Sequence, residues 1–591
     1  MVRMFDVCAG VVSENLSQLS KIVGKHMREF RLLNGLLGSF VFVIVAGYVC
    51  YPLYVTLTTS LHVNGSFSLT HYIDLLSPRN SAAWEAVWNS VLVSILTVSF
   101  SGVVGMVFAI VLTQIEFPGR ELLSRFAILP IALPPLVGVI SFLLVFGESG
   151  ILPKVIQRML MTTTVPFALD GIPAIVVVHV YSFYVYFYLF ISTGLRRLDS
   201  SLIEAASGFG STPWRTYRRI ILPELRPALF GASILTFMAS MASFSAPLLF
   251  AGEKRFMTLQ IYTTKLNGYL DIAAAQSVLL TVISVGFFLL LKVSGESGIQ
   301  RRMTRGSSRL GKLALGTLAR AVLLTAFFLM VAIELLPILT IVAISFVREG
   351  SWTWQIVPTV FTIENYKKLL SDPHSFAPIG NSLLMSCIAL VASVVVGVAA
   401  AYLIVKGGLQ RTKSMFDALV TFPFAIPGTI IAISLILAFN SPNLLSGYTV
   451  LVGTFWILPL AYFIRLYPLV VRSTGAALGQ LDDSLLEAGQ SCGAGLWRRF
   501  RRIVFPLIAP GIVSGALLVT ISALGEFVSS ILLYTYSSRP ISVEILSELR
   551  SYDFGGAAAY SVILLMFIMG IIYLSRLLLQ RLHMGVTRQY F

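Results

Sequence analysis

Residues 198–223 read LDSSLIEAASGFGSTPWRTYRRIILP, and residues 481–506 read LDDSLLEAGQSCGAGLWRRFRRIVFP. The two stretches align without a gap at a constant offset of 283 residues. Both are polar and basic in a chain that is otherwise strongly apolar, so they indicate a working surface that a repeated fold presents twice. The distinctive positions recur as pairs: Glu204 with Glu487, Ala205 with Ala488, Gly210 with Gly493, Trp214 with Trp497, Arg218 and Arg219 with Arg501 and Arg502, and Pro223 with Pro506.

The composition predicts that a lipid bilayer surrounds most of the chain. Hydrophobic residues make up 56% of the 591 positions and charged residues 12%, whereas soluble domains carry about 25% charged residues. A helix of about 20 apolar residues crosses the hydrocarbon core and satisfies its own backbone hydrogen bonds there. We therefore expect an all-α polytopic membrane protein. About twelve apolar runs are long enough, at 36–59, 88–113, 123–147, 172–195, 228–250, 273–293, 320–347, 382–405, 415–439, 447–470, 511–535 and 557–579.

The basic residues predict how these spans are oriented. If the N-terminus is cytoplasmic and twelve spans alternate, most of the 43 Lys+Arg residues fall on the cytoplasmic side, as the positive-inside rule requires. We therefore expect both termini in the cytoplasm. The net charge of +16 reflects this orientation and not nucleic-acid binding, because the basic residues flank apolar spans at short intervals.

The duplication extends through both halves. Trp88-Asn89-Ser90 corresponds to Gly380-Asn381-Ser382, and LPIALPP at 129–135 corresponds to FPFAIPG at 422–428. Each half holds six predicted spans, so both halves enter the membrane in the same direction as a parallel repeat. The expected domains are a cytoplasmic tail at 1–35, a first repeat at 36–293, a cytoplasmic linker at 294–319, a second repeat at 320–580 and a cytoplasmic tail at 581–591.

Two other segments have weaker signals. GSSRLGK at 306–312 matches the start of a phosphate-binding loop, but Leu313 stands where Ser or Thr holds magnesium, and no strand precedes it. We therefore expect no ATPase in this chain. Residues 11–31 fit a cytoplasmic tail better than an interfacial helix, and the four cysteines form no CxxC pair.

Each duplicated stretch predicts two short helices joined by a glycine turn. Ser201 and Glu204 fit a capping box, as do Ser484 and Glu487. Gly210 and its counterpart can adopt a left-handed turn at little cost. Pro223 and Pro506 are expected to end the second helix before the next span.

The first stretch resembles a known signature. Glu204, Ala205, Ala206, Gly210, Ile220, Leu222 and Pro223 spell EAA-xxx-G-x9-I-x-LP, which is similar to the cytoplasmic motif of permease subunits in binding-protein-dependent ABC importers. The second stretch departs from it at Gly489 and Phe505. Because glycine has a helix propensity about 1 kcal/mol poorer than alanine, we expect the second segment to be the less rigid one.

The resemblance implies the type I importer permease fold and a set of partners. In that family the motif forms a coupling helix seated on an ATP-binding subunit, so two motifs imply two ATP-binding cassette subunits on the cytoplasmic side. ATP and magnesium are then bound by those subunits, and this chain has no catalytic residue, cofactor or metal site. A periplasmic or lipid-anchored binding protein delivers substrate from outside. The implied location is the bacterial inner membrane.

Residues after each coupling segment are candidates for the translocation pathway. Ionisable groups at membrane depth usually face a cavity or a partner, so Glu526 serves either the pathway or a structural contact between helices. Glu334 and His179 fit structural roles better, and the six histidines show no metal-ligand spacing. The pathway candidates are Ser243, Phe244, Ser245, Pro247, Glu526, Phe527 and Ser529.

The substrate is indicated only by resemblance. SFSAPLLFAG at 243–252 and FVSSILLYTYSSRPISVEI at 527–545 are most similar to fused permeases of the ferric-iron type. Thiamine and aminoethylphosphonate importers have related fused permeases, and polyamine and sulfate permeases share the core. A secondary transporter also fits twelve spans in two parallel halves, and a channel subunit is a further alternative, but neither requires two coupling segments.

Overall fold

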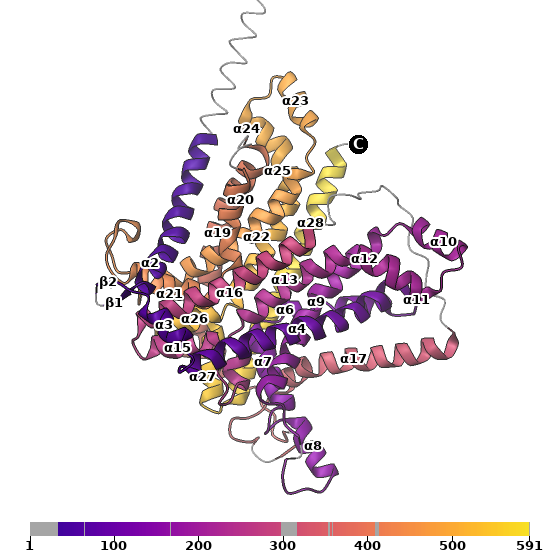
Figure 1. Cartoon of the computed structure of the whole chain (residues 1–591), viewed down its shortest axis with the longest axis vertical. Helices are drawn as coiled ribbons and strands as arrows, with labels where there is room; N and C mark the ends of the chain where they lie inside the picture. Colours follow the sequence, from indigo (N-terminus) through magenta and orange to yellow (C-terminus); the bar gives the residue numbers. More distant parts are fainter. Residues whose placement is uncertain are drawn as a thin grey trace, which may run out of the picture.

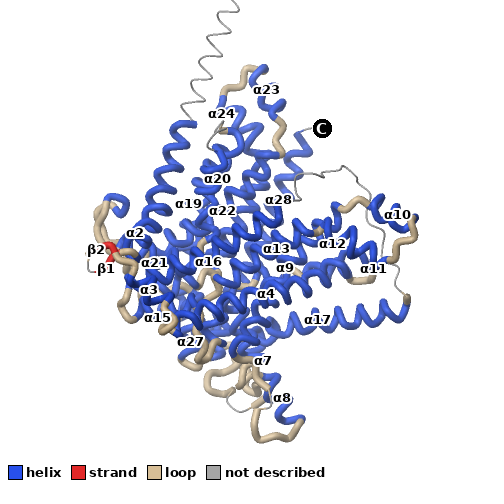
Figure 2. Tube along the Cα trace, in the orientation of Figure 1, coloured by secondary structure: helices blue, strands red, loops and turns tan. Residues whose placement is uncertain are grey.

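The computed structural model describes residues 34–63, 65–165, 167–296, 316–352, 355–356, 358–407 and 413–589. The described residues are mostly helical, and their one sheet is a hairpin of β1 (His62–Val63) and β2 (Ser66–Phe67) (Figure 2). The expected N-terminal tail up to residue 33, the GSSRLGK stretch and most of the linker lie outside the described residues.

Helices of the first half follow a helical stretch at residues 34–45. They are η1 (Ala46–Cys50), α2 (Tyr51–Ser60), α3 (Thr70–Leu76), α4 (Ser81–Gln114), α5 (Arg120–Phe126), α6 (Leu129–Ala132), α7 (Pro135–Phe146), α8 (Ile151–Met159), α9 (Gly171–Arg197), α10 (Ser200–Gly208), α11 (Pro213–Thr216), η2 (Tyr217–Ile221), α12 (Leu222–Glu224), α13 (Arg226–Met241), α14 (Ser245–Phe250), α15 (Met257–Leu266) and α16 (Leu270–Glu296).

Helices of the second half repeat this order. They are α17 (Thr317–Ile344), α18 (Glu364–Ser371), α19 (Pro373–Lys406), α20 (Lys413–Thr421), η3 (Phe422–Ala425), α21 (Gly428–Phe439), η4 (Leu444–Ser446), α22 (Ile457–Gly479), α23 (Asp483–Ser491), α24 (Leu496–Arg499), η5 (Phe500–Val504), α25 (Phe505–Leu524), α26 (Val528–Leu533), α27 (Ile541–Arg550) and α28 (Phe554–Gln589).

The number of spans differs from the prediction. Among the described residues, nine helices are long and apolar enough to cross a membrane, or up to eleven if each of two bent pairs is one span. The helix Ile457–Gly479 carries Arg465 and Arg472 and is not one of them. The count of twelve, and the division into two sets of six, therefore stay predictions.

Breaks at proline and glycine explain where the predicted spans differ from the helices. The predicted span 415–439 bends by 101° between Ala425 and Gly428. The predicted span 123–147 is divided into α5, α6 and α7. Pro134 and Pro135, which have no backbone N–H to continue a helix, lie at the break between α6 and α7. The repeated LPIALPP and FPFAIPG sequences are thus helix breaks, and hydrophobic length alone could not distinguish them from continuous spans.

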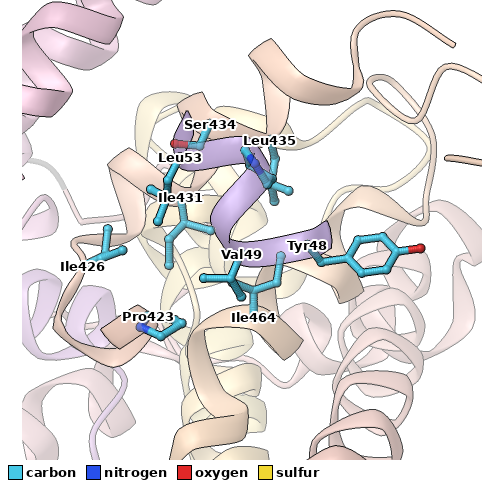
Figure 3. Close-up of a pocket in the computed structure, with 10 residues that line it drawn as sticks. Tyr48, Val49, Leu53, Pro423, Ile426, Ile431, Ser434, Leu435 and Ile464 are labelled. Carbon is cyan, nitrogen blue, oxygen red and sulfur yellow. The ribbon is translucent and has the colours of Figure 1, made fainter. Parts of the chain in front are cut away.

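The first helix of each half packs on the other half. In α2, the Thr56 Oγ1 donates to Ser434 Oγ of α21 at 2.7 Å, and an apolar pocket lies between these two segments (Figure 3). In α17, the Phe327 ring lies 5.0 Å from Phe108 of α4. The contacts of α2 and α17 with the opposite halves join the two halves. One large hydrophobic core cluster contains residues from both halves.

The Asn-Ser pairs of the repeat make equivalent contacts. Asn89 Nδ2 donates to the Arg255 carbonyl at 3.0 Å, and Asn381 Nδ2 donates to the Arg539 carbonyl at 3.1 Å. The neighbouring serine hydroxyl accepts a backbone N–H at the start of α15 in the first half and of α27 in the second. These pairs therefore attach the same short helix to the long span of each half.

Candidate functional site

The duplicated stretches form two matching helix-turn-helix units. Helices α10 and α11 enclose Gly210 at φ 71°, and α23 and α24 enclose Gly493 at φ 75°. Glycine adopts this left-handed conformation without the cost that other residues incur. We call these units the first and second coupling segments, at residues 198–223 and 481–506. They stand at separate extremities of the molecule (Figure 1).

Their first helices are capped differently from the prediction. The N-cap residues are Asp199 and Asp482, whose carboxylates accept from the backbone N–H of Ser201 at 2.9 Å and of Ser484 at 3.0 Å. The expected capping boxes beginning at the serines are wrong, because the aspartate two residues earlier satisfies the free N–H group. The Ser484 N–H holds the pKa of Asp482 below its usual value.

Large aromatic side chains are exposed on both coupling segments. Phe209 is 92% exposed, Trp214 71% and Trp497 72%. Trp214 stacks on Tyr217, and Trp497 stacks on Phe500 at the corresponding positions. Exposed aromatic groups of this size, flanked by arginines, are typical of a surface that a partner covers.

The predicted docking residues lie on this surface. Ala206, Pro223 and Pro506 are half-buried, and the remaining predicted positions are exposed in both copies. The exposed ones are Glu204, Ala205, Gly210, Trp214, Arg218, Arg219, Glu487, Ala488, Gly493, Trp497, Arg501 and Arg502.

Only one of the two prolines behaves as expected. The helix at Trp214–Glu224 ends one residue after Pro223, at a bend of 61°, whereas Trp497–Leu524 runs as one helix through Pro506. Each proline lies two residues after the end of a π-helical turn, η2 or η5. The wider turn relieves the clash between a proline ring and the preceding carbonyl groups.

Gly489 has a packing reason that the sequence did not show. A Cβ atom at this position would lie 2.7 Å from Ile503 Cδ1 and 3.4 Å from Arg499 Cγ. The glycine therefore allows α23 to approach η5 closely. Arg499 Nη1 also donates to Gln490 Oε1 at 3.0 Å. The lower rigidity expected of the second segment stays a prediction, and this close packing opposes it.

Two helix breaks meet near the contact between the halves. Helix α13 ends at Met241 and α14 starts at Ser245, and the break between α25 and α26 falls at the corresponding residues. Phe244 and Phe527 occupy these breaks, are fully buried, and approach each other with ring centroids 5.9 Å apart. The structure thus brings together two residues that are equivalent in the repeat.

Beside this contact lies a buried ion pair. Arg465 Nη1 of α22 lies 2.5 Å from Glu526 Oε2, and Glu526 Oε1 accepts from the Ser529 backbone N–H at 3.0 Å. Glu526 is 6% exposed and the Arg465 side chain 24%. The structural role expected as one alternative for Glu526 therefore has a named partner.

Comparison with known proteins decides the family. The model of the binding-protein-dependent transport system inner membrane component matches residues 101–347 and again 393–587. The chain is a member of this family. Because the match occurs twice, this permease holds two family domains fused in one chain, as the duplicated coupling segments predicted.

Relatives of the permease cover it to different extents. A probable ABC transporter permease of Sinorhizobium fredii is 29% identical over 92% of this chain and 95% of its own length. A ferric transport system permease of Actinobacillus pleuropneumoniae is 27% identical over 93% of this chain and 78% of its own. A spermidine/putrescine transport system permease of Salmonella typhimurium is 30% identical, over 44% of this chain and 93% of its own.

Three of the other predicted polar residues of the permease have polar contacts. His179 Nε2 lies 2.8 Å from Ser243 Oγ, Glu334 Oε1 accepts from the Tyr184 hydroxyl at 2.8 Å, and the Ser529 hydroxyl donates to the Gly428 carbonyl at 3.3 Å. Ser245 and Pro247 are buried in α14, and the Ser245 Oγ has no hydrogen-bond partner among the described residues. Within the described residues, no group of three or more His, Cys, Asp or Glu side chains is placed to hold a metal ion.

Arg465 is the residue of this permease that sequence reasoning missed. It lies in a predicted apolar span, where an ionisable side chain signals a cavity or a partner. That signal was present in the sequence, but its partner Glu526 is 61 positions away, and no local pattern links the two. The corresponding first-half residues, at the offset of 283, are Ser182 and Ser243.

Proposed function

We propose that this ABC importer permease transports ferric iron and that each coupling segment docks one ATP-binding cassette subunit on the cytoplasmic side. The observation that carries the docking proposal is the repeated pair of exposed helices with its aromatic and basic residues. When the two ATP-binding subunits close on each other, they move the two coupling segments towards each other. The helices that continue from the coupling segments transmit this motion to the membrane spans. ATP and magnesium belong to those subunits.

The arrangement of the halves supports an inward-open resting state. Phe244 and Phe527 hold the halves together at the helix breaks, while the two coupling segments stand apart (Figure 1). In the proposed cycle, approach of the two segments separates the phenylalanines and opens the outer side, where a periplasmic or lipid-anchored binding protein delivers substrate. Both termini are cytoplasmic in this topology, because the coupling segments and the basic residues then share one side.

Ferric iron is favoured over polyamines by the share of this chain that each relative covers. The ferric permease matches both fused halves, whereas the spermidine/putrescine permease matches less than half of this chain. Because substrate selection rests largely with the binding protein in this type of importer, ferric transport does not require a dedicated metal site in the permease.

Uptake of labelled substrates tests the proposal. Cells that express the permease with its neighbouring subunits should accumulate ferric iron in an ATP-dependent manner, and cells lacking the permease should not. Thiamine, aminoethylphosphonate and spermidine serve as competing substrates in the same cells. Permease-dependent uptake of one of these without iron uptake would contradict the ferric assignment and leave the permease role intact.

A further inference from the structure

A cavity of about 890 Å³ lies away from the contact between the halves. Its lining comes from the end of α4, from α5, from the last turns of α9 and from the first turn of α17. His179, which contacts the helix break, lies between about two and five turns earlier on α9. The cavity therefore sits where spans end, on the side of the first coupling segment, which α9 enters directly.

The lining of this cavity is rich in arginine. Arg120, Arg125, Arg196 and Arg320 face it together with Glu116 and Glu121, so the positive charges outnumber the negative ones. Arg125 and Arg196 are exposed, and within the described residues neither forms an ion pair with a carboxylate.

Two of the arginines are held in place by backbone carbonyl groups. Arg120 Nε donates to the Leu112 carbonyl at 2.6 Å, and Arg320 donates to the Glu116 carbonyl. These bonds use only part of each guanidinium, so both groups keep N–H donors. The planar guanidinium fork matches the oxygens of a phosphate group.

A buried hydroxyl group gives independent evidence for a ligand. Ser192 is 7% exposed and lines the cavity, yet its Oγ has no hydrogen-bond partner among the described residues. A buried polar group without a partner costs free energy. A rotation of the Ser192 side chain to another staggered rotamer would let its hydroxyl donate to an acceptor oxygen bound in the cavity.

The second half does not repeat this cavity chemistry. At the offsets of the repeat, Ala418 corresponds to Arg125 and Gly479 to Arg196. The nearby Arg472 is already paired with Asp417 at 3.1 Å. The two unpaired arginines that line this cavity therefore have no counterparts at the equivalent positions of the second half.

We infer that this cavity binds the phosphate headgroup of an anionic phospholipid. Arginines at the ends of spans attract anionic lipids of the cytoplasmic leaflet, and the apolar residues Phe117, Ile128 and Leu189 in the same lining fit the glycerol and the first acyl carbons. The bound lipid would join α9 and α17 next to the first coupling segment. The inference is independent of which substrate the permease transports.

Native mass spectrometry of the purified full chain tests the inference. The protein is titrated with phosphatidylglycerol and, separately, with phosphatidylcholine. Wild type should retain phosphatidylglycerol preferentially. The variant Arg125→Gln/Arg196→Gln should bind phosphatidylglycerol about 30-fold more weakly, from the loss of two arginine contacts. The control Arg576→Gln, at an exposed arginine on α28 outside the cavity, should bind as wild type does.

Four results would overturn the inference. Equal retention of the two lipids would remove the headgroup specificity, and an unchanged affinity in the double variant would place the lipid elsewhere. Displacement of phosphatidylglycerol by millimolar inorganic phosphate would show that the cavity takes the free anion. If the double variant does not fold, Ser192→Val decides, since loss of its hydrogen bond should weaken binding about tenfold, and unchanged binding would contradict the site.

Discussion

The pair Arg465–Glu526 offers a quantitative test of how the second half is held together. Its two side chains come from α22 and from the break before α26, and their charged atoms lie 2.5 Å apart. The first half has Ser182 and Ser243 at the corresponding positions. Serine is therefore a substitution that this fold already accommodates, and the variants Arg465→Ser, Glu526→Ser and the double variant form a matched cycle.

The exposure of each partner determines the expected magnitudes. Arg465→Ser leaves the Glu526 carboxylate, 6% exposed, without a counter-charge, which costs about 3–5 kcal/mol. Glu526→Ser leaves an arginine whose side chain is 24% exposed and reaches water more easily, so we expect about 2 kcal/mol. The double variant removes both charges and should be more stable than Arg465→Ser alone.

The assay is the Tm of the purified full chain in detergent, with uptake measured in parallel. At about 2–4 °C per kcal/mol for a domain of 150–250 residues, the loss of about 3–5 kcal/mol in Arg465→Ser should lower the Tm by about 6–20 °C, and the double variant should recover part of that loss. Additive losses in the two single variants would refute the ion pair. A stable double variant without uptake would assign Glu526 to the pathway in addition.

Three further predictions concern the coupling segments and the helix breaks. Gly489→Ala should reduce uptake because the new Cβ meets Ile503 Cδ1, although alanine favours a helix by about 1 kcal/mol. Adding Ile503→Val, which removes the Cδ1 atom, should restore uptake. An increase in uptake from Gly489→Ala alone would contradict the close packing of Gly489 on Ile503. The pKa of Asp482 is lowered in the folded state, so the carboxylate stabilises the fold above the unfolded pKa of about 3.9. This stabilisation is lost as the pH falls through the folded pKa. The difference in Tm between wild type and Asp482→Asn should therefore shrink on acidification, and a difference that is independent of pH would count against the N-cap. The double variant Phe244→Ala/Phe527→Ala loses the ring contact that is proposed to close the outer side. The assembled transporter should therefore hydrolyse ATP faster in the absence of binding protein. Unchanged basal hydrolysis would argue against a role of the two phenylalanines in closing the outer side.

The sequence alone was sufficient to predict the features that both halves share. A gapless repeat specified two coupling segments, and the structure forms both with the same glycine turn and the same exposed tryptophans. The alignment at the offset of 283 also paired Phe244 with Phe527, and the structure places these two rings in contact. Equivalent residues meet in this way only where they lie close to the axis that relates two packed halves, as Phe244 and Phe527 do.

Other features depend on contacts that no local pattern contains. Helix α17, the first helix of the second half, packs on the first half, and the Tyr184 hydroxyl donates a hydrogen bond to Glu334 there. This contact joins residues that are far apart in the sequence. The caps at Asp199 and Asp482 prevailed over the predicted serines because two acceptors competed for one helix start. Pro506 stayed within a helix because the π turn before it relieves the clash.

Cross-linking from the tips of the coupling segments tests the central proposal, that each segment docks one ATP-binding subunit. Cys492 is naturally exposed in the second segment, and Phe209 is its counterpart in the first. With the other cysteines replaced by serine, chains carrying Cys492 or Phe209→Cys should each cross-link to an ATP-binding subunit, and Glu204→Ala/Glu487→Ala should abolish uptake. A complex that transports substrate but cross-links from neither position, with uptake unaffected by the glutamate variants, would contradict the proposal.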